Sequence, residues 1–465
     1  MNRQLPCRRL AFVIIAAAAA LTLTGCTRSQ MNYQIAEAIG TDGKYENNEP
    51  VETPKMKEER AAQEQSESDE QHLTEVLDQA AQEAAGYNFD EAIATLNTLS
   101  GSAALDGRVK EAREEYEKGD SALVAWDGDI PHLCFPVLIE DPLRAFDGDD
   151  MAQTYASTMV TTNEFKAILD SLYKNNYILV DIHSIAALSE NGNMEAETLR
   201  LPEGKKPIVL SQDNVDYSSF RNGDGIATAL TVDDTGAVKA KYTDEEGHDE
   251  VGDYDFIPIL DSFIAAHPDF SFRGARGIAS VAGQKGIFGY DLPDEQEEDP
   301  DTPDSDGSGE EDAKTDDTAA GGSTSGLTED QKQIAEVAKA MREEGWSIAS
   351  AGWSHSYMND ASMTEEQFRQ EIDIWESKVA ALTGKTDILF FPYGAEVSYP
   401  GDNLEYLKDH GIVYLCGLWG DTDYREVGDG YMRMTRRFVD GSSLLSAPDY
   451  FSDFFHVDSI LDEDR

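Results

Sequence analysis

Short apolar segments alternate with amphipathic segments from about residue 128 onward, and this alternation is the strongest constraint on the fold. "LCFPVLI", "YILVDI" and "KPIVLS" are typical of buried strands. Between the first two, "TNEFKAILDSLYKNN" places Phe165, Ile168, Leu169 and Leu172 on one helical face. Strands separated by helices favour a parallel sheet covered by helices. The sequence therefore predicts an α/β domain over residues 128–460.

Other segments of this domain carry their own signals. "ALTVDDTGAVKAKY" predicts a hairpin around an Asp-Thr-Gly turn. Two later helices are expected to open with capping boxes, formed by Thr328 with Gln331 and by Thr364 with Gln367. Residues 294–317 hold thirteen acids against one lysine. They predict a disordered acidic insertion over 293–327, within one domain, because strand and helix patterns resume after it.

The N-terminus has the features of an export signal. Arg3, Arg8 and Arg9 precede "LAFVIIAAAAALTLTGC", an apolar run too short to favour a permanent membrane span. "LTGC" resembles a bacterial lipobox, which implies a signal peptide over 1–25 and lipidation of Cys26. The expected location is extracytoplasmic, with the lipid anchor as the only contact with the membrane.

Between the lipobox and the α/β domain we expect a tether and a helical collar. Residues 26–69 are polar and predict a flexible tether. Residues 70–124 contain two helical patterns, and "GYNFDEAIATL" resembles one tetratricopeptide-type unit. A repeat array needs about three such units, so a helical collar packed on the following domain is favoured. A protein-binding role for the collar and the acidic insertion stays open.

Charge and cysteine content limit the partners and the redox chemistry. A net charge of −54 and a pI near 4.2 count against nucleic acid and anionic lipid as partners. Cys134 and Cys416 lie in apolar, strand-like stretches. A disulfide between them and two buried free thiols are both compatible with the sequence.

The order of segments resembles the NodB-homology, or polysaccharide deacetylase, family (carbohydrate esterase family four), in particular its Gram-positive lipoprotein branch. The resemblance rests on "PIVLSQDNVDY", "DFIPILDSFIAAHPDFSFRGARGIASVAG", "EEGWSIASAGWSHSYM" and "DILFFPYGAE", together with the segment that begins "AFDGDDMAQTYAS". It implies a distorted (β/α) barrel with its site at the C-terminal ends of the strands. It also implies hydrolysis of N-acetyl groups on peptidoglycan or another acetylated polysaccharide, with a divalent metal, usually zinc.

The first family motif is a pair of aspartates after a strand. The resemblance implies that Asp213 is the catalytic base, and it puts Asn214 in the place of the first metal ligand. A neutral amide is a poorer zinc ligand than a carboxylate. Asp216 is close enough in sequence to substitute for it, but we expect Asp216 to be a loop acid that faces solvent.

The second and third motifs are also altered. The resemblance makes His355 a metal ligand and leaves Ala351 where the other histidine is expected; in the alternative register, Asn359 takes that place. In "FFPYG", Phe390 replaces an arginine, while the backbone N–H of Tyr393 keeps a catalytic role toward the oxyanion. Trp353 and Pro392 are expected to contact the substrate. His456 has no place in the alignment.

Two functions follow from these expectations. One is a surface lipoprotein that hydrolyses acetyl groups on a glycan, with Asp213 as its base. The other is a pseudoenzyme that binds glycan or organises the cell envelope after losing its metal, because Asn214 and Ala351 are neutral. Loss of even an outer-sphere group weakens metal binding roughly 10–100-fold, so two lost ligands favour a non-catalytic or strongly altered site.

The lipid anchor is tested by replacing Cys26 with Ala. The variant cannot accept the lipid chains, whose burial in the bilayer supplies about 0.8 kcal/mol per CH₂ group. We expect it to lose incorporation of radiolabelled palmitate in growing cells. Cys7→Ala, in the same signal segment, should leave the labelling unchanged. A Cys26→Ala variant that is still labelled would contradict the prediction.

Overall fold

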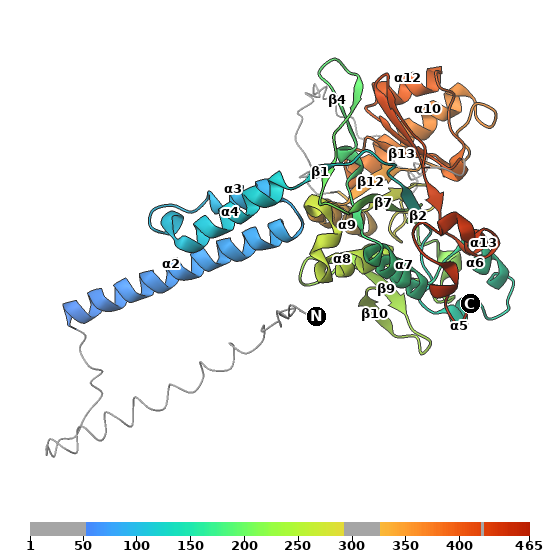
Figure 1. Ribbon diagram of the computed structural model, residues 1–465. Helices are drawn as coiled ribbons and strands as arrows, with labels where there is room; N and C mark the ends of the chain where they lie inside the picture. Colours follow the sequence, from blue (N-terminus) through green and yellow to red (C-terminus); the bar gives the residue numbers. More distant parts are fainter. Residues whose placement is uncertain (1–52, 293–325, 420–422) are drawn as a thin grey trace, which may run out of the picture. The chain divides into compact units, whose positions relative to one another are not determined.

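The computed structural model describes residues 53–292, 326–419 and 423–465 (Figure 1). Cys26, the signal segment and almost all of the acidic insertion lie outside the described residues. The chain divides into two units, residues 1–70 and 71–465. No helix in the described part of the chain is both long enough and apolar enough to cross a membrane.

The helices are α2 (Pro54–Ala85), α3 (Phe89–Leu96), α4 (Gly107–Ser121), α5 (Pro142–Ala145), α6 (Ala152–Thr158), α7 (Thr162–Lys174), α8 (Phe256–Ala266), α9 (Glu329–Glu344), α10 (Glu365–Ile374), α11 (Ala381–Thr383), α12 (Asp402–Asp409) and α13 (Gly441–Ser446). The strands are β1 (Val124–Ala125), β2 (His132–Phe135), β3 (Tyr177–Leu179), β4 (Ala186–Leu188), β5 (Met194–Ala196), β6 (Arg200–Leu201), β7 (Lys206–Gln212), β8 (Ala229–Val232), β9 (Val238–Thr243), β10 (Asp249–Gly252), β11 (Ile278–Val281), β12 (Ser347–Ser350), β13 (Ile388–Phe390), β14 (Tyr414–Gly417), β15 (Arg425–Gly428), β16 (Tyr431–Thr435) and β17 (Arg437–Phe438).

Helix α2 begins earlier than the sequence predicted. Residues 54–69 were expected in the flexible tether, but they are helical, with every side chain exposed. Their Ala, Glu, Gln and Lys content has high helix propensity, and pairs four residues apart, such as Lys55 with Glu59, add support. The polar composition of residues 54–69 is compatible with both a solvent-exposed helix and a disordered tether, so it did not distinguish the two. Further along, α2 packs through Val76 and Ala80 against α3 and α4.

The main sheet has the order β15-β16-β14-β13-β12-β11-β7-β2-β17, with β3 also paired to β7. Apart from the antiparallel β15–β16 pair, every pairing in it is parallel. The two ends of this sheet are connected by consecutive residues. At one end β16 pairs with β14, at the other β17 pairs with β2, and only Arg436 separates β16 from β17 in the chain. This curled sheet is compatible with the predicted α/β class, while the NodB type of barrel stays a prediction.

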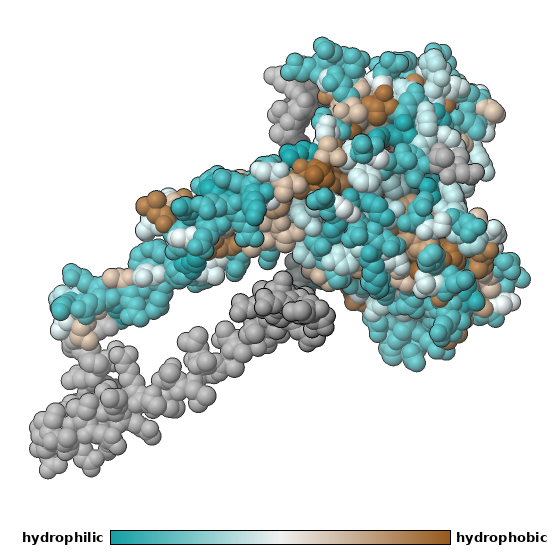
Figure 2. Space-filling view, in the orientation of Figure 1, coloured by the Kyte–Doolittle hydropathy of each residue, from teal (hydrophilic) through white to brown (hydrophobic). Residues whose placement is uncertain are grey.

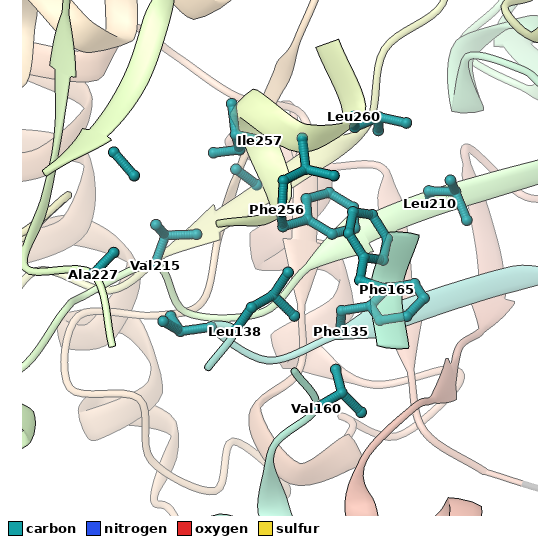
Figure 3. Packing of buried hydrophobic residues seen from close by; sticks show 14 of the residues in the cluster. Phe135, Leu138, Val160, Phe165, Leu210, Val215, Ala227, Phe256, Ile257 and Leu260 are labelled. Carbon is teal, nitrogen blue, oxygen red and sulfur yellow. The ribbon is translucent and has the colours of Figure 1, made fainter. Parts of the chain in front are cut away.

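Helices surround the sheet (Figure 1). Their buried side chains pack against those of the strands and form the hydrophobic core. Phe135 of β2, Phe165 of α7 and Phe256 of α8 are fully buried and meet as a three-ring cluster (Figure 3). The centroid of the Phe165 ring lies 4.9 Å from that of Phe135 and 4.7 Å from that of Phe256. Such pairs add about 0.5–1.5 kcal/mol beyond the area they bury. Outside the core, the face seen in Figure 2 is mostly hydrophilic with small apolar patches.

Several local predictions are confirmed. Thr328 with Gln331 and Thr364 with Gln367 form capping boxes at the starts of α9 and α10. Strands β8 and β9 form the predicted antiparallel hairpin, and β10 extends it to three strands. Cys134 and Cys416 are both buried free thiols, and burial raises the pKa of the Cys416 thiol to about 12. Of the two possibilities left open by the sequence, the structure therefore has the free thiols.

The aromatic cluster is tested by Phe165→Ala. Removing a fully buried ring leaves a cavity, so the free energy of unfolding should fall by about 3–5 kcal/mol. Urea denaturation followed by tryptophan fluorescence measures the change. Leu105→Ala, at a side chain that is 86% exposed, should change stability by less than about 0.5 kcal/mol. Equal effects of the two substitutions would contradict the packing of the three rings.

Candidate functional site at the C-terminal ends of the strands

Side chains named by the sequence follow neighbouring parallel strands at their C-terminal ends. Asp213 comes directly after β7, Ala351 after β12, and Pro392 two residues after β13. Parallel strands bring these ends to one edge of the sheet, which we call the mouth. Ser280 of β11 joins them, since its hydroxyl donates to Asp213 Oδ1 at 2.9 Å and accepts from the backbone N–H of Asn214, also at 2.9 Å.

Asp213 faces a buried arginine that sequence reasoning missed. The Arg436 side chain is fully buried, and its Nη1 lies 3.5 Å from Asp213 Oδ1. The guanidinium also donates to Cys134 Sγ at 3.3 Å and to the Phe391 carbonyl at 3.2 Å. It stacks 4.2 Å from the centroid of the Phe390 ring. A buried charge requires such a partner and such hydrogen bonds, because its desolvation is otherwise uncompensated.

The resemblance implied an arginine at position 390, where this chain has Phe390, and Arg436 places a guanidinium beside that ring. It reaches Asp213 from the junction of β16 and β17 rather than from β13. The only signal in the sequence was a charged pair, Arg436 and Arg437, in the strand-like segment "YMRMTRRFV". That pattern does not reveal the partner, since the contact depends on β17 pairing with β2.

Asn214 and Asp216 bind one another and the residues around them. Asn214 has a left-handed backbone with φ 47°. Its side-chain Nδ2 donates to Asp216 Oδ2 at 3.2 Å, and its Oδ1 accepts from the Ala282 N–H at 3.3 Å. Asp216 is 5% exposed and pairs with Arg221 at 3.1 Å. The prediction that Asp216 faces solvent was wrong, because a counter-charge later in the same loop allows the acid to be buried.

His355 lies in a loop that Glu371 fixes. The Glu371 carboxylate accepts from the backbone N–H of Ser354 at 2.8 Å and from its hydroxyl at 2.7 Å. His355 itself has φ 53°. Its Nε2 is buried and has no hydrogen-bond partner among the described residues. Burial lowers the pKa of His355, and the charges of Asp213 and Asp216 oppose this effect, so the imidazole is neutral near pH 7.

Two tyrosines cover this histidine at the surface. The Tyr393 ring meets the His355 ring edge-on at 5.1 Å, and the Tyr357 ring stacks on Tyr393 at 4.7 Å. Tyr357 is 53% exposed and Tyr393 is 56% exposed. Tyr393 also has a left-handed backbone, with φ 56°. Sequence reasoning assigned Tyr393 a backbone role only and did not identify Tyr357.

The other residues considered from the sequence differ in burial. Pro392, expected to contact the substrate, is buried in the turn Pro392–Gly394. Trp353 is half-buried against Gly283, where a Cβ would lie 2.2 Å from its ring. Ala351 is fully buried and carries no donor atom. His456 is exposed beside a short helical turn, Val457–Ser459.

The donor set at the mouth does not fit the divalent metal that the resemblance implied. Both polar atoms of the Asn214 amide are already hydrogen-bonded, Asp216 is paired with Arg221, and Ala351 has no ligand atom. Among the described residues, two groups of His, Asp and Glu have ligand atoms within 4.8 Å of one another, and neither includes Asp213 or His355. The chemistry open to the mouth is therefore that of its own side chains and backbone amides.

A double-mutant cycle tests the pairing of Arg436 with Asp213. Arg436→Met strands a buried carboxylate and should lower the free energy of unfolding by about 3–5 kcal/mol. Arg436→Met combined with Asp213→Asn should cost less than the sum of the single changes, because the stranded charge is gone. Arg60→Met, at an exposed pair with Glu64, should cost about 1 kcal/mol or less. Additive losses in the cycle would refute the pairing.

Comparison with known proteins gives one match. A family model described as polysaccharide deacetylase matches residues 320–415, a span that contains β12, β13, the His355 loop and both tyrosines. No curated protein and no solved structure matches the chain. Polysaccharide deacetylases are metal-dependent enzymes acting on glycans, so the match suggests glycan N-deacetylation and supports a relationship between this chain and the polysaccharide deacetylase family.

Proposed function

We propose that this protein binds an acetylated glycan at the mouth, as a lipid-anchored protein of the cell surface, without metal-dependent hydrolysis. The observation that carries the proposal is that both polar atoms of the Asn214 amide, at the position of the first ligand, are already hydrogen-bonded, Nδ2 to Asp216 and Oδ1 to the Ala282 N–H. The match to a polysaccharide deacetylase model supports a glycan as the ligand. Peptidoglycan, or another acetylated polysaccharide of the envelope, is the substrate class that fits an anchored protein.

The stacked tyrosines are the surface on which we place a sugar ring. Tyr357 and Tyr393 expose more than half of their surface. Exposed aromatic surface rimmed by polar groups marks binding sites. The ring faces suit the apolar C–H face of a pyranose, and the hydroxyls suit its polar edge. The Nε2 of His355, whose ring contacts that of Tyr393, has no hydrogen-bond partner in the described part of the chain and is available to a group of the ligand that enters deeper.

A second candidate function is hydrolysis without a metal. The observation that favours it is the neutral His355, whose lowered pKa leaves it able to accept a proton from water near pH 7. The left-handed turn at Tyr393 also keeps a backbone N–H at the same edge of the sheet for an oxyanion. In this case Asp213, held by Arg436 and Ser280, would orient the water rather than bind a metal.

Glycan binding is tested with N-acetylated chitohexaose in isothermal titration calorimetry. Tyr357→Ala and Tyr393→Ala should each weaken binding roughly tenfold, corresponding to about 1.4 kcal/mol. Tyr254→Ala is the matched control, since Tyr254 belongs to another tyrosine pair, with its ring centroid 5.1 Å from that of Tyr242. Unchanged affinity in the Tyr357 and Tyr393 variants would rule out the tyrosine surface as the binding site.

The same oligosaccharide separates the two candidate functions when acetate release is measured. The proposed binding function predicts no release, with or without added zinc. Release that persists in EDTA and is lost in Asp213→Asn and in His355→Gln would instead establish the metal-free hydrolysis. Release that requires added zinc and is lost in Asp213→Asn would overturn the conclusion that the mouth does not fit a metal.

A further inference from the structure

A second constellation of metal-ligating side chains lies away from the mouth. Asp373, Glu376 and His410, which we call the Asp373 cluster, have one ligand atom each within 4.8 Å of one another. His410 Nδ1 and Glu376 Oε2 are already 2.7 Å apart. One imidazole with two carboxylates is a donor set suited to zinc and similar divalent ions.

The fold brings the three ligands together from three elements. Asp373 lies in the last turn of α10, and Glu376 lies in the π-helical turn Trp375–Ala380 that follows it. Residues three apart on a helix share a face. His410 is the capping residue directly after α12. Single π-helical turns within helices are frequently found at functional sites.

Tyr406 orients two of the ligands. Its ring packs against the His410 ring with centroids 4.3 Å apart, and its hydroxyl donates to Asp373 Oδ1. Groups that hold metal ligands in place in this way typically improve affinity roughly 10–100-fold. The cluster is therefore partly organised for binding before any ion arrives.

The Asp373 cluster also opens onto a cavity. Glu376 and His410 line a cavity of 730 Å³ whose other walls include Ser347, Ile388 and Ile412. These residues lie at or near the N-terminal ends of β12, β13 and β14, so the cavity is at the end of the sheet opposite the mouth. An ion with three protein ligands would keep its remaining coordination positions on the cavity side, as open sites do.

We propose that Asp373, Glu376 and His410 form a binding site for a divalent transition-metal ion, such as zinc, that opens onto this cavity and is independent of the mouth. The net charge of −54 concentrates cations at the surface, and the two carboxylates add a local attraction. The remaining coordination positions take water from the cavity, whose lining carries both signs of charge, with Lys385 and Arg342 beside Asp387 and Asp409.

The chain provides an internal comparison. Asp244, Glu246 and His248 have the same ligand types within the same distance, but they lie on the exposed turn of the β9–β10 hairpin. The His248 side chain is 74% exposed, and none of the three lines the cavity. This exposed group serves as a control for the Asp373 cluster.

The test is a zinc titration of the full chain in detergent, by isothermal titration calorimetry, after removal of bound metal with EDTA. We expect about one tight site per chain, and His410→Ala and Glu376→Gln should each weaken it by about 100-fold or more, since outer-sphere losses alone reach that range. Tyr406→Phe should weaken it roughly tenfold. His248→Ala and Asp213→Asn should leave the affinity unchanged.

Cobalt supplies a spectroscopic readout of the ligands of the bound ion. Co²⁺ bound by His410 should give visible d–d absorption bands in the wild type and in His248→Ala, and these bands should be lost in His410→Ala and in Glu376→Gln. Circular dichroism checks that each variant is folded. Wild-type affinity in a folded Glu376→Gln would overturn the proposal, and so would loss of the tight site in Asp213→Asn, which would place the metal at the mouth.

Discussion

The charge of Arg436 is the constraint on which the mouth depends. This guanidinium sits, fully buried, where β16 passes into β17, the point at which the two ends of the sheet meet. Burying it is tolerated only because Asp213, the Phe391 carbonyl, the Cys134 thiol and the Phe390 ring surround it. The strands that supply these groups are thereby tied to one register around Asp213.

The same pairing stabilises a carboxylate at a mouth whose donor set does not fit a metal. A carboxylate at the tip of β7 needs a positive partner, and Arg436 supplies one at 3.5 Å. A divalent ion added beside Asp213 would face repulsion from that guanidinium, which a low-dielectric setting strengthens. Asn214 and Asp216 also bind each other, and Asp216 pairs with Arg221. What remains exposed is an aromatic surface, which suits recognition better than Lewis-acid chemistry.

Two chemical sites at opposite ends of the strands affect how any bound metal is interpreted. Metal in the purified protein would ordinarily be taken as a sign of deacetylase activity at Asp213. The Asp373 cluster offers a second set of metal-ligating side chains, which includes the imidazole of His410. At the mouth, the imidazole is that of His355. Metal content therefore has to be assigned with variants of both sites. The two sites share no ligand, so substitutions at one leave the donor atoms of the other in place.

The sequence by itself determined the features that depend on neighbouring residues. The apolar spacing of α7, the capping boxes of α9 and α10, the β8–β9 hairpin and the position of Asp213 after β7 were all predicted, because each depends on a few consecutive residues. Only the tertiary structure decided the burial of Asp216, the pairing of Arg436 with Asp213, and the contact of Tyr357 with Tyr393. These depend on which charges and rings meet when strands distant in sequence pair, a matter of burial and electrostatics that local spacing does not encode.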